Sequence, residues 1–303
     1  MNRVRLSLVP LIAVLAPLPA AAQRLDSLRA RIAARIARAP AQAVGVYFKD
    51  LEGRDSLLVS AATRFHAAST MKVPVMIQVF RDRDAGTLSL DDSLLVHDSF
   101  PSIVDGSLFA VDKKDDSDST LYELVGRRVP MRQLLELMET VSSNLATNLL
   151  IERVGAARAN ATAHALGADS ILVLRGVEDG LAYRAGRNNT TTARDLGVLL
   201  AAIAQNRAAT PAACAEMLAI LGRQHFKEGI PAGVPSDATV YHKTGWVGQL
   251  VYHDAAIVQR ADPKGRGRRR YVLVVLTGGI QQDTVAYDLV ADVSRLVYAA
   301  GAR

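Results

Sequence analysis

A serine and a lysine three positions apart, Ser69 and Lys72, are the residues whose spacing says most about chemistry. The residues after them predict a helix, and on a helix such a pair lies on one face. A serine hydroxyl is a weak nucleophile unless a neighbouring group accepts its proton. A lysine amine can accept it when burial or a second cation lowers the lysine pKa. A helix start followed by an exposed lysine gives the same tetrapeptide, so other residues must decide between the two interpretations.

Two later segments could complete such a site. Ser142 and Asn144 lie in a turn between two predicted helices, and Lys243, Thr244 and Gly245 lie on a predicted strand. Taken singly, the first segment is typical of a helix cap and the second of a strand end. Their order along the chain is informative. The serine–lysine pair follows an N-terminal hairpin, Ser-x-Asn lies within a helical region, and Lys-Thr-Gly precedes the last hairpin and helix.

This ordered set resembles the penicillin-recognising serine hydrolases, and class A β-lactamases most closely. The resemblance extends over most of the chain. It includes the segments 64–72, before and through the serine–lysine pair, and 229–235, before Lys-Thr-Gly. It implies that Ser69 attacks a β-lactam carbonyl and forms an acyl-enzyme, while Lys72 takes or relays its proton. It also implies that Ser142 passes a proton to the leaving nitrogen, and that Asn144 binds Lys72 and the amide side chain of the substrate.

The resemblance assigns substrate binding to the late strand. Lys243 and Thr244 would bind the substrate carboxylate, with Gly245 and Trp246 following on the same strand. The backbone N–H groups of Ser69 and Trp246 would form the oxyanion hole. Trp246 departs from the family pattern, in which a small residue follows the glycine. Its indole either stacks on a substrate ring and narrows the cleft, or forms an amphipathic wedge at the sheet edge.

The loop that should carry the deacylating carboxylate also departs from the pattern. Class A enzymes place a glutamate in an Arg-x-Glu signature, whereas here Glu178 follows Arg175 one residue late. Glu178 is the predicted catalytic base; it could instead be a solvated loop acid, and Asp179 is a weaker candidate. Arg175 would lack an ion-pair partner at Asn189 unless Asp179 or another acid serves. Ser143 replaces the aspartate of Ser-Asp-Asn.

The N-terminus is typical of an exported precursor. Residues 1–22 combine two arginines, an apolar stretch and three small alanines, which predicts a signal peptide and a periplasmic or secreted protein. No later segment is apolar enough to span a bilayer, so no stable membrane insertion is expected after cleavage. The single cysteine, Cys214, excludes an internal disulfide and is expected to be buried.

The amino-acid composition limits the kinds of molecule that the protein is expected to bind. The net charge of +6 comes largely from arginines in segments 24–38 and 264–270, but aromatics are only 5% of residues and none interleaves with these charges. Nucleic-acid binding is therefore disfavoured relative to solvated charge facing an anionic envelope surface. The six histidines show no metal-ligand spacing, and neither a metal nor a cofactor is expected. A small-molecule β-lactam is the expected partner, and a monomer is expected by analogy with the family.

Periodicity predicts one α/β (α+β) domain over residues 23–303. Its antiparallel sheet is built from both chain ends, about 23–68 and 222–303, and is flanked by helices, with an all-helical subdomain, about 69–221, inserted between them. The acidic segment 112–119 is expected to be a surface loop. The predicted helices are 24–38, one after Ser69 ending at Gly86, 131–138, 145–154, 191–203, 211–221 and 283–299; the predicted strands are 44–49, 56–60, 239–243, 250–259 and 271–277.

Three functions fit these residues. The first is a β-lactamase that turns over its acyl-enzyme. The second is a related serine hydrolase, a DD-peptidase or an esterase, with weak β-lactam turnover. The third is a non-hydrolytic penicillin-binding envelope protein that stays acylated. The altered position of Glu178 keeps the second and third open.

Overall fold

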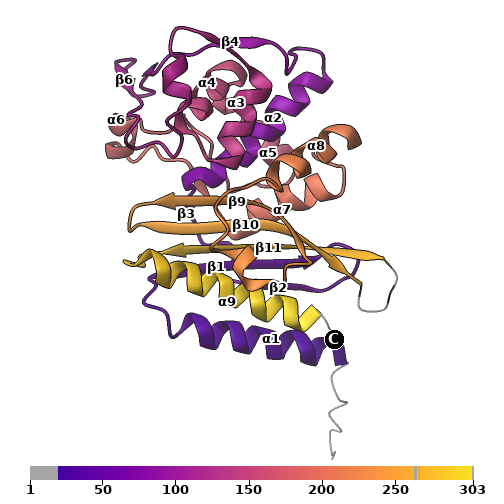
Figure 1. Cartoon of the computed structure of the whole chain (residues 1–303). Coiled ribbons are helices and arrows are strands. Elements are labelled where there is room, and N and C mark those ends of the chain that lie inside the picture. Colours follow the sequence, from indigo (N-terminus) through magenta and orange to yellow (C-terminus); the bar gives the residue numbers. More distant parts are fainter. Residues whose placement is uncertain (1–19, 263–264, 266, 302–303) are drawn as a thin grey trace, which may run out of the picture.

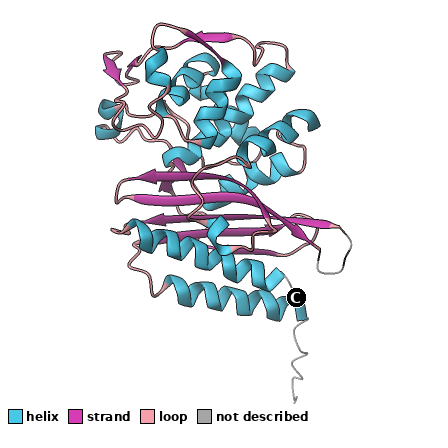
Figure 2. Ribbon diagram, viewed as in Figure 1, coloured by secondary structure: helices cyan, strands magenta, loops and turns pink. Residues whose placement is uncertain are grey.

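A five-stranded antiparallel sheet joins the two ends of the chain (Figures 1 and 2). The computed structural model describes residues 20–262, 265 and 267–301. The strand order is β2-β1-β11-β10-β9, which confirms the predicted sheet, and β9 forms one edge. The strands are β1 (Ala43–Asp50), β2 (Ser56–Val59), β9 (Thr239–Val247), β10 (Val251–Ala261) and β11 (Arg268–Gly278).

Two helices from opposite chain ends cover one face of the sheet, below it in Figure 1: α1 (Ala20–Ile36) and α9 (Asp283–Gly301). Strand side chains alternate between the faces. Val46 and Phe48 of β1 pack in the cluster that contains the buried residues of α1 and α9, whereas Tyr47 between them packs in the core on the other face. Residues 1–19 of the predicted signal peptide lie outside the described part.

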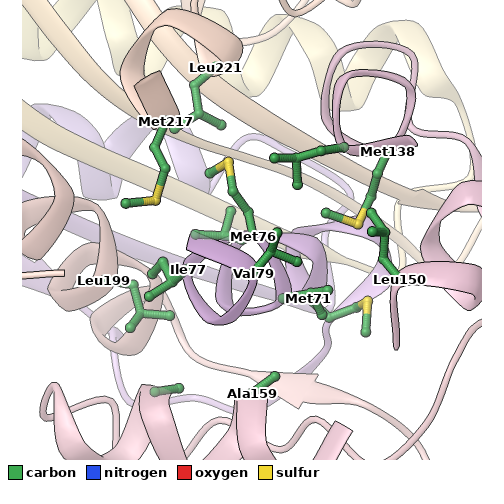
Figure 3. Close-up of a cluster of buried hydrophobic side chains, with 14 of the residues drawn as sticks. Met71, Met76, Ile77, Val79, Met138, Leu150, Ala159, Leu199, Met217 and Leu221 are labelled. Atoms are coloured by element: carbon green, nitrogen blue, oxygen red, sulfur yellow. The ribbon is translucent and has the colours of Figure 1, made fainter. Parts of the chain in front are cut away.

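The other face carries the helical region, in which α2 (Lys72–Asp84) is central (Figure 3). Ten of its thirteen residues are buried, a pattern typical of a helix with neighbours on every side. Met76, Ile77 and Val79 of α2 pack among side chains from the surrounding helices. Those helices are α3 (Met131–Thr140), α4 (Asn144–Val154), α5 (Ala156–Ala165), α7 (Ala193–Ala204) and α8 (Pro211–Leu221), and the short α6 (Gly180–Arg184) lies nearer the surface.

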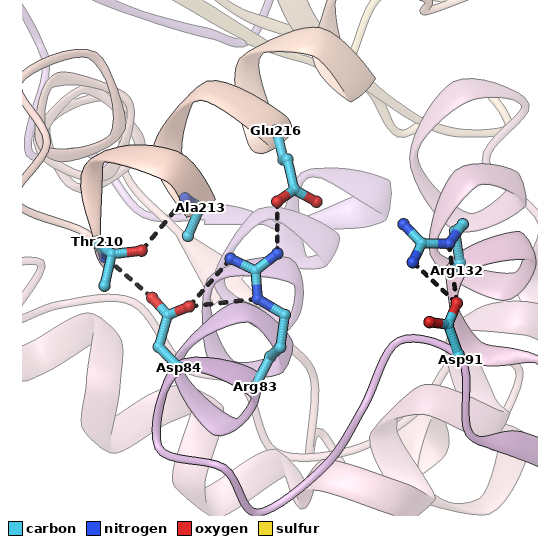
Figure 4. Close-up of polar contacts among 7 residues, drawn as sticks. All are labelled: Arg83, Asp84, Asp91, Arg132, Thr210, Ala213 and Glu216. Carbon is cyan, nitrogen blue, oxygen red and sulfur yellow. Dashed lines mark hydrogen bonds and ion pairs between the residues drawn. The ribbon is translucent and has the colours of Figure 1, made fainter.

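Polar contacts tie the far end of α2 to α8 (Figure 4). The guanidinium of Arg83 bonds the carboxylates of Asp84 and Glu216, and Asp84 accepts a hydrogen bond of 3.0 Å from the backbone N–H of Thr210. Thr210 also caps α8 with its hydroxyl. Partly exposed ion pairs contribute little stability each, typically below about 1 kcal/mol. We infer that their main effect is to fix the orientation of two helices already packed together.

Three short strand pairs were not predicted. Their strands are only two or three residues long, which is too short for an alternating pattern to show in the sequence. They are β3 (Phe65–His66) with β8 (Thr190–Thr191), β4 (Ser93–Leu95) with β7 (Arg128–Pro130), and β5 (Ser99–Pro101) with β6 (Leu108–Ala110). The first pair places the end of the Arg175 loop beside the chain that leads into Ser69. In the described part of the chain, no helix combines the length and apolarity needed to cross a bilayer.

Substituting Gly197 by alanine should destabilise the fold. A Cβ at this position of α7 would lie 2.3 Å from Cδ1 of Tyr47, so the helix would have to move off the sheet. We expect the free energy of unfolding to fall by about 1–3 kcal/mol, as for other overpacked cores. Gly180→Ala is the matched control, since its Cβ would meet only the end of the flexible Arg184 side chain. Urea unfolding of both variants checks this, and equal stabilities would contradict the described packing of α7 on β1.

Candidate active site

Ser69 lies in a 3-10 turn, Ala68–Met71, that leads directly into α2. The turn is entered through Ala68, whose φ is +47°, and the N–H of Ala68 donates to Nδ1 of His66 at 3.1 Å. Strand β9 runs close against this turn. A Cβ on Gly245 would lie 3.0 Å from Cγ2 of Thr70 and 3.1 Å from its nitrogen. Gly245 is therefore required for the edge strand to reach the nucleophile.

Left-handed backbone marks three parts of the site. Among the described residues, five non-glycine positions have a positive φ, and three of them are Ala68, Ser142 and Glu178. The last two have φ values of 63° and 64°. Such conformations cost of the order of 1–3 kcal/mol each and cluster at functional sites. The strained residues thus lie next to the predicted nucleophile, Ser69, or are themselves the predicted proton donor and catalytic base.

Lys72 is completely buried, and its Nζ is held by the Ser142 turn. It donates to the Ser142 carbonyl at 2.6 Å, the Ser142 hydroxyl at 3.1 Å and Oδ1 of Asn144 at 3.1 Å. Burial, followed by the charge of Lys243, holds the pKa of Lys72 well below its usual range. The amine thus gives up its own proton more readily than an ordinary lysine and is more available as a proton acceptor. In this structure it binds Ser142 rather than the Ser69 hydroxyl.

Lys243 approaches the same hydroxyl from β9. It is also completely buried, and its Nζ donates to the Ser142 hydroxyl at 3.0 Å and to the Thr244 carbonyl at 3.1 Å. Burial lowers the pKa of Lys243, although nearby carboxylates oppose the shift. Because a hydroxyl has two acceptor sites and one hydrogen, two lysine donors leave the Ser142 proton free to point elsewhere. Ser142 also lines the cleft, so this proton can be directed into it.

Glu139 of α3 is a site residue that the sequence did not reveal. Its side chain is buried, and neither carboxylate oxygen has a hydrogen-bond partner among the described residues. Burial raises the pKa of Glu139, whereas the charges of Lys243 and Lys72 act to lower it. A buried, unpaired acid is costly unless opposite charge compensates it. Glu139 is therefore a buried acid whose charge acts on both lysines, and only its burial, not its sequence context, identifies it.

Glu178 is joined to Lys72 through Asn144. The Asn144 amide accepts from Lys72 with Oδ1 and donates from Nδ2 to Oε1 of Glu178 at 2.6 Å. The other carboxylate oxygen of Glu178 accepts from the backbone N–H of Asp112 at 3.1 Å. Burial raises the pKa of Glu178, and these two hydrogen bonds oppose the rise. A partly buried carboxyl with two fixed donors is not the solvated loop acid that was the alternative interpretation.

The acidic segment 112–119 does more than form a surface loop, and this part of the prediction was incomplete. Asp116 accepts hydrogen bonds of 2.9 Å from the backbone N–H groups of both Asn144 and Leu145, at the start of α4. Ser143 caps the same helix with its hydroxyl. Together they supply the capping that an aspartate in Ser-Asp-Asn would provide. The loop also holds Glu178 through Asp112.

Within the described residues, the Arg175 loop is held by hydrogen bonds instead of an ion pair. Asn189 accepts from the N–H of Arg175 and donates to its carbonyl, while the Arg175 guanidinium binds carbonyl oxygens and Asn188. Asp179 caps α6 and accepts from Ser102 and Ile103, so both of its oxygens are engaged. Although burial opposes the shift, hydrogen bonds from Ala182, Ile103 and Ser102 lower the pKa of Asp179, whereas the pKa of Glu178 is raised, so Asp179 is the weaker base of the two.

A cleft of about 300 Å³ brings most of the predicted residues together, although Asn144 and Glu178 do not line it. Its lining includes Ser69, Ser142, Thr244, Gly245 and Trp246, while Lys72 and Lys243 are buried behind the wall. Residues two apart on a strand direct their N–H and C=O groups to the same side. Since the Thr244 carbonyl faces Lys243 at the free edge of the sheet, the Trp246 N–H faces that edge too. This direction suits an oxyanion-hole donor.

No cluster of three or more potential metal ligands occurs within the described residues. Cys214 is buried in the helical core, as expected. His242 pairs with Asp254 at 2.9 Å, and His253 bonds the His66 carbonyl. These two histidines beside the β9–β10 pair thus have structural partners.

Comparison with known proteins identifies the family. The model of the beta-lactamase enzyme family matches residues 27–300, so this chain belongs to that family. Among solved structures, PBP-A is 29% identical, with a TM-score of 0.75 over 91% of this chain and 96% of its own. A β-lactamase from Sphaerobacter thermophilus is 26% identical, with a TM-score of 0.75 over 91% and 97%.

A third solved structure is similar to this chain in fold alone. The TLA-1 extended-spectrum β-lactamase is 18% identical, with a TM-score of 0.78 over 92% of this chain and 99% of its own. No curated protein matches the sequence. Family and fold together support a serine hydrolase of the β-lactamase or penicillin-binding type.

Glu139→Gln should make Lys243 titrate at lower pH. A carboxylate near Lys243 favours the charged ammonium, so the neutral amide removes that support and lowers the Lys243 pKa further. NMR titration of the lysine Cε resonances measures the shift. Glu136→Gln is the matched control, because Glu136 lies on the same helix but pairs with Arg223 at the surface. An unchanged Lys243 titration in Glu139→Gln would show that Glu139 does not act on the site.

Proposed function

We propose that the protein is a serine β-lactamase that hydrolyses the β-lactam amide through a Ser69 acyl-enzyme and so confers β-lactam resistance. One observation carries the proposal. Two buried lysines with lowered pKa values converge on the Ser142 hydroxyl, which lines one cleft with Ser69. A site of this kind has a nucleophile, an amine able to hold its proton, and a cation to attract an anionic substrate.

The acylation step follows from these contacts. Ser69 Oγ attacks the lactam carbonyl carbon while its proton passes to Lys72, directly or through Ser142. The carbonyl oxygen gains negative charge and is bound by the N–H groups of Ser69 and Trp246. As the C–N bond breaks, Ser142 gives its free proton to the nitrogen and is resupplied by a lysine that binds its oxygen. Lys243 and Thr244 hold the substrate carboxylate, beside Gly245 and Trp246.

Deacylation requires a base that removes a proton from water, and we assign this role to Glu178. Its raised pKa and its link to Lys72 through Asn144 support the assignment. Both Nδ2 contacts of Asn144, to Glu178 and to the Asp115 carbonyl at 3.4 Å, lie within the protein. To bind the amide of the substrate, the Asn144 side chain would therefore have to give up one of these contacts.

A penicillin-binding protein that stays acylated is the second candidate. The one-residue displacement of Glu178 and the occupation of its Oε1 by Asn144 favour it, as does the likeness to PBP-A, a variant of which was solved as an acyl-enzyme complex with penicillin G. A DD-peptidase or esterase with the same nucleophile is the third. For each candidate we propose export by the signal peptide, a periplasmic or secreted location and a monomer.

One assay separates these functions. Purified mature protein is mixed with a chromogenic cephalosporin, and both colour and intact mass are followed. Sustained colour supports the β-lactamase. A single burst with a stable mass adduct supports the penicillin-binding protein. Neither colour nor adduct, together with cleavage of a peptide or ester, supports the related hydrolase and contradicts β-lactam turnover.

Ser69→Ala should abolish the covalent adduct and all turnover, because it removes the hydroxyl that forms the ester with the acyl group. Intact-mass spectrometry after exposure to the cephalosporin checks this. Ser117→Ala is the matched control, since Ser117 lines the same cleft without a lysine contact to its hydroxyl in the structure. The control should still be acylated. An adduct that persists on Ser69→Ala would refute Ser69 as the nucleophile.

Glu178→Gln should trap the acyl-enzyme. An amide cannot take a proton from water, and loss of a general base slows such steps by about 10²–10⁴-fold. The mass adduct should therefore accumulate while colour release falls to a burst. Glu123→Gln, at an exposed acid paired with Lys113, serves as the control and should turn over normally. Unchanged steady-state turnover in Glu178→Gln would move the role of base to another group.

A further inference from the structure

The cleft that contains Ser69, Ser142 and Thr244 is also lined by aromatic residues. We call this part of its lining the aromatic annex and define it by four residues: Phe226 after α8, Trp246 on β9, Tyr252 on β10 and Tyr287 on α9. Glu178 and Asn144 do not line this cavity. The annex is a feature of this chain's own residues, and the acylation chemistry described above does not use its rings.

The rings of the annex form a connected wall. Trp246 and Tyr252 face each other across neighbouring strands with ring centroids 6.4 Å apart, and Tyr252 meets Tyr287 edge-on at 5.4 Å. Tyr252 is fixed because its hydroxyl donates to Asp283. In contrast, Trp246 is 55% exposed and Phe226 is 38% exposed. Two large aromatic surfaces therefore remain available to a ligand in the cleft.

The charge at the annex favours a cation, in contrast to the Ser142 side of the cleft, where Lys72 and Lys243 bind the hydroxyl from behind. The carboxylates of the lining are Glu228, which is exposed, and Asp254, which is already bound by the Ile230 N–H and His242. The lining residues include neither lysine nor arginine, and burial lowers the pKa of His253 to about 4, so this histidine is neutral at pH 7. Aromatic faces attract cations, and a nearby carboxylate strengthens that attraction.

We infer that the aromatic annex binds a planar, cationic aromatic group on the leaving half of the substrate, beside its carboxylate. This inference rests on the proposed function, which places Ser142 at the leaving nitrogen and Thr244 at the carboxylate, and both residues line the same cavity as the annex. Thr244 lies two residues before Trp246 on β9, so their side chains are on the same face of the strand. A substituent on the ring carbon next to the carboxylate would extend past Thr244 toward Trp246. The acyl side chain would leave the cleft in the other direction, toward Asn144.

Binding can be tested without acylation, because Trp246 is the only tryptophan and its fluorescence reports on the annex. N-benzylpyridinium should quench Trp246 emission in the wild-type protein. Tyr287→Leu and Glu228→Gln should each weaken its binding, by about tenfold for the ring substitution. Tyr183→Leu, at an exposed tyrosine outside the cleft, is the control and should bind as the wild type does. If quenching did not saturate, or if both annex variants bound N-benzylpyridinium as tightly as the wild type does, the annex proposal would be overturned. This holds whatever the acylation assay shows.

A matched pair of cephalosporins then tests whether a substrate reaches the annex. The two share one acyl side chain and carry methyl or pyridiniummethyl next to the carboxylate, and they are bound to Ser69→Ala so that no acylation occurs. The pyridinium compound should bind about tenfold more tightly, and Tyr287→Leu should remove the difference. Equal affinities would contradict the substrate assignment. Failure of the wild type to be acylated by either compound would refute the proposed function instead, and the N-benzylpyridinium result would still decide the annex.

Discussion

Two ammonium groups sharing one serine hydroxyl are the constraint on which the rest of the site depends. Lys72 and Lys243 both donate to Ser142 Oγ, at 3.1 and 3.0 Å, so their nitrogens are at most about 6 Å apart. With both charged, their repulsion is at least about 3 kcal/mol at an effective dielectric constant of about 20, in addition to the cost of burial. The protein relieves this by lowering both lysine pKa values and by burying Glu139 nearby. The lowered lysine pKa values make an amine available as a base, whereas Glu139 favours the charged form of both lysines.

Rigid packing keeps these groups together although they come from distant parts of the chain. Helix α2 is surrounded by other helices and holds Lys72 in its first turn, while Gly245 allows the edge strand to run against the Ser69 turn. Strained backbone at Ala68 and Ser142 persists because the core on either side determines its position. The packing of the helical core and the sheet thus compensates for the free-energy cost of the strained backbone at the site.

Local signals in the sequence predicted the sheet, the main helices and the residues that converge on the cleft. Ser69 and Lys243 were predictable because three short motifs occur in an order along the chain that resembles a known family, although each motif alone is uninformative. Glu139 was not, because an acid near a helix end has no distinguishing pattern until its burial is known. The capping role of Asp116 and the hydrogen bond between Asn144 and Glu178 were not predicted, for a related reason. Both depend on a contact between loops far apart in sequence.

The most direct test of this account is the protonation of Lys72 itself. NMR of selectively labelled lysines, assigned with Lys72→Arg, would follow its Nζ through a pH titration of the folded protein. The account predicts a pKa well below the usual lysine value of about 10.4, so that the amine is available as a base near neutral pH. An ordinary pKa would mean that Lys72 stays charged beside Lys243. It could not then take the proton of Ser69.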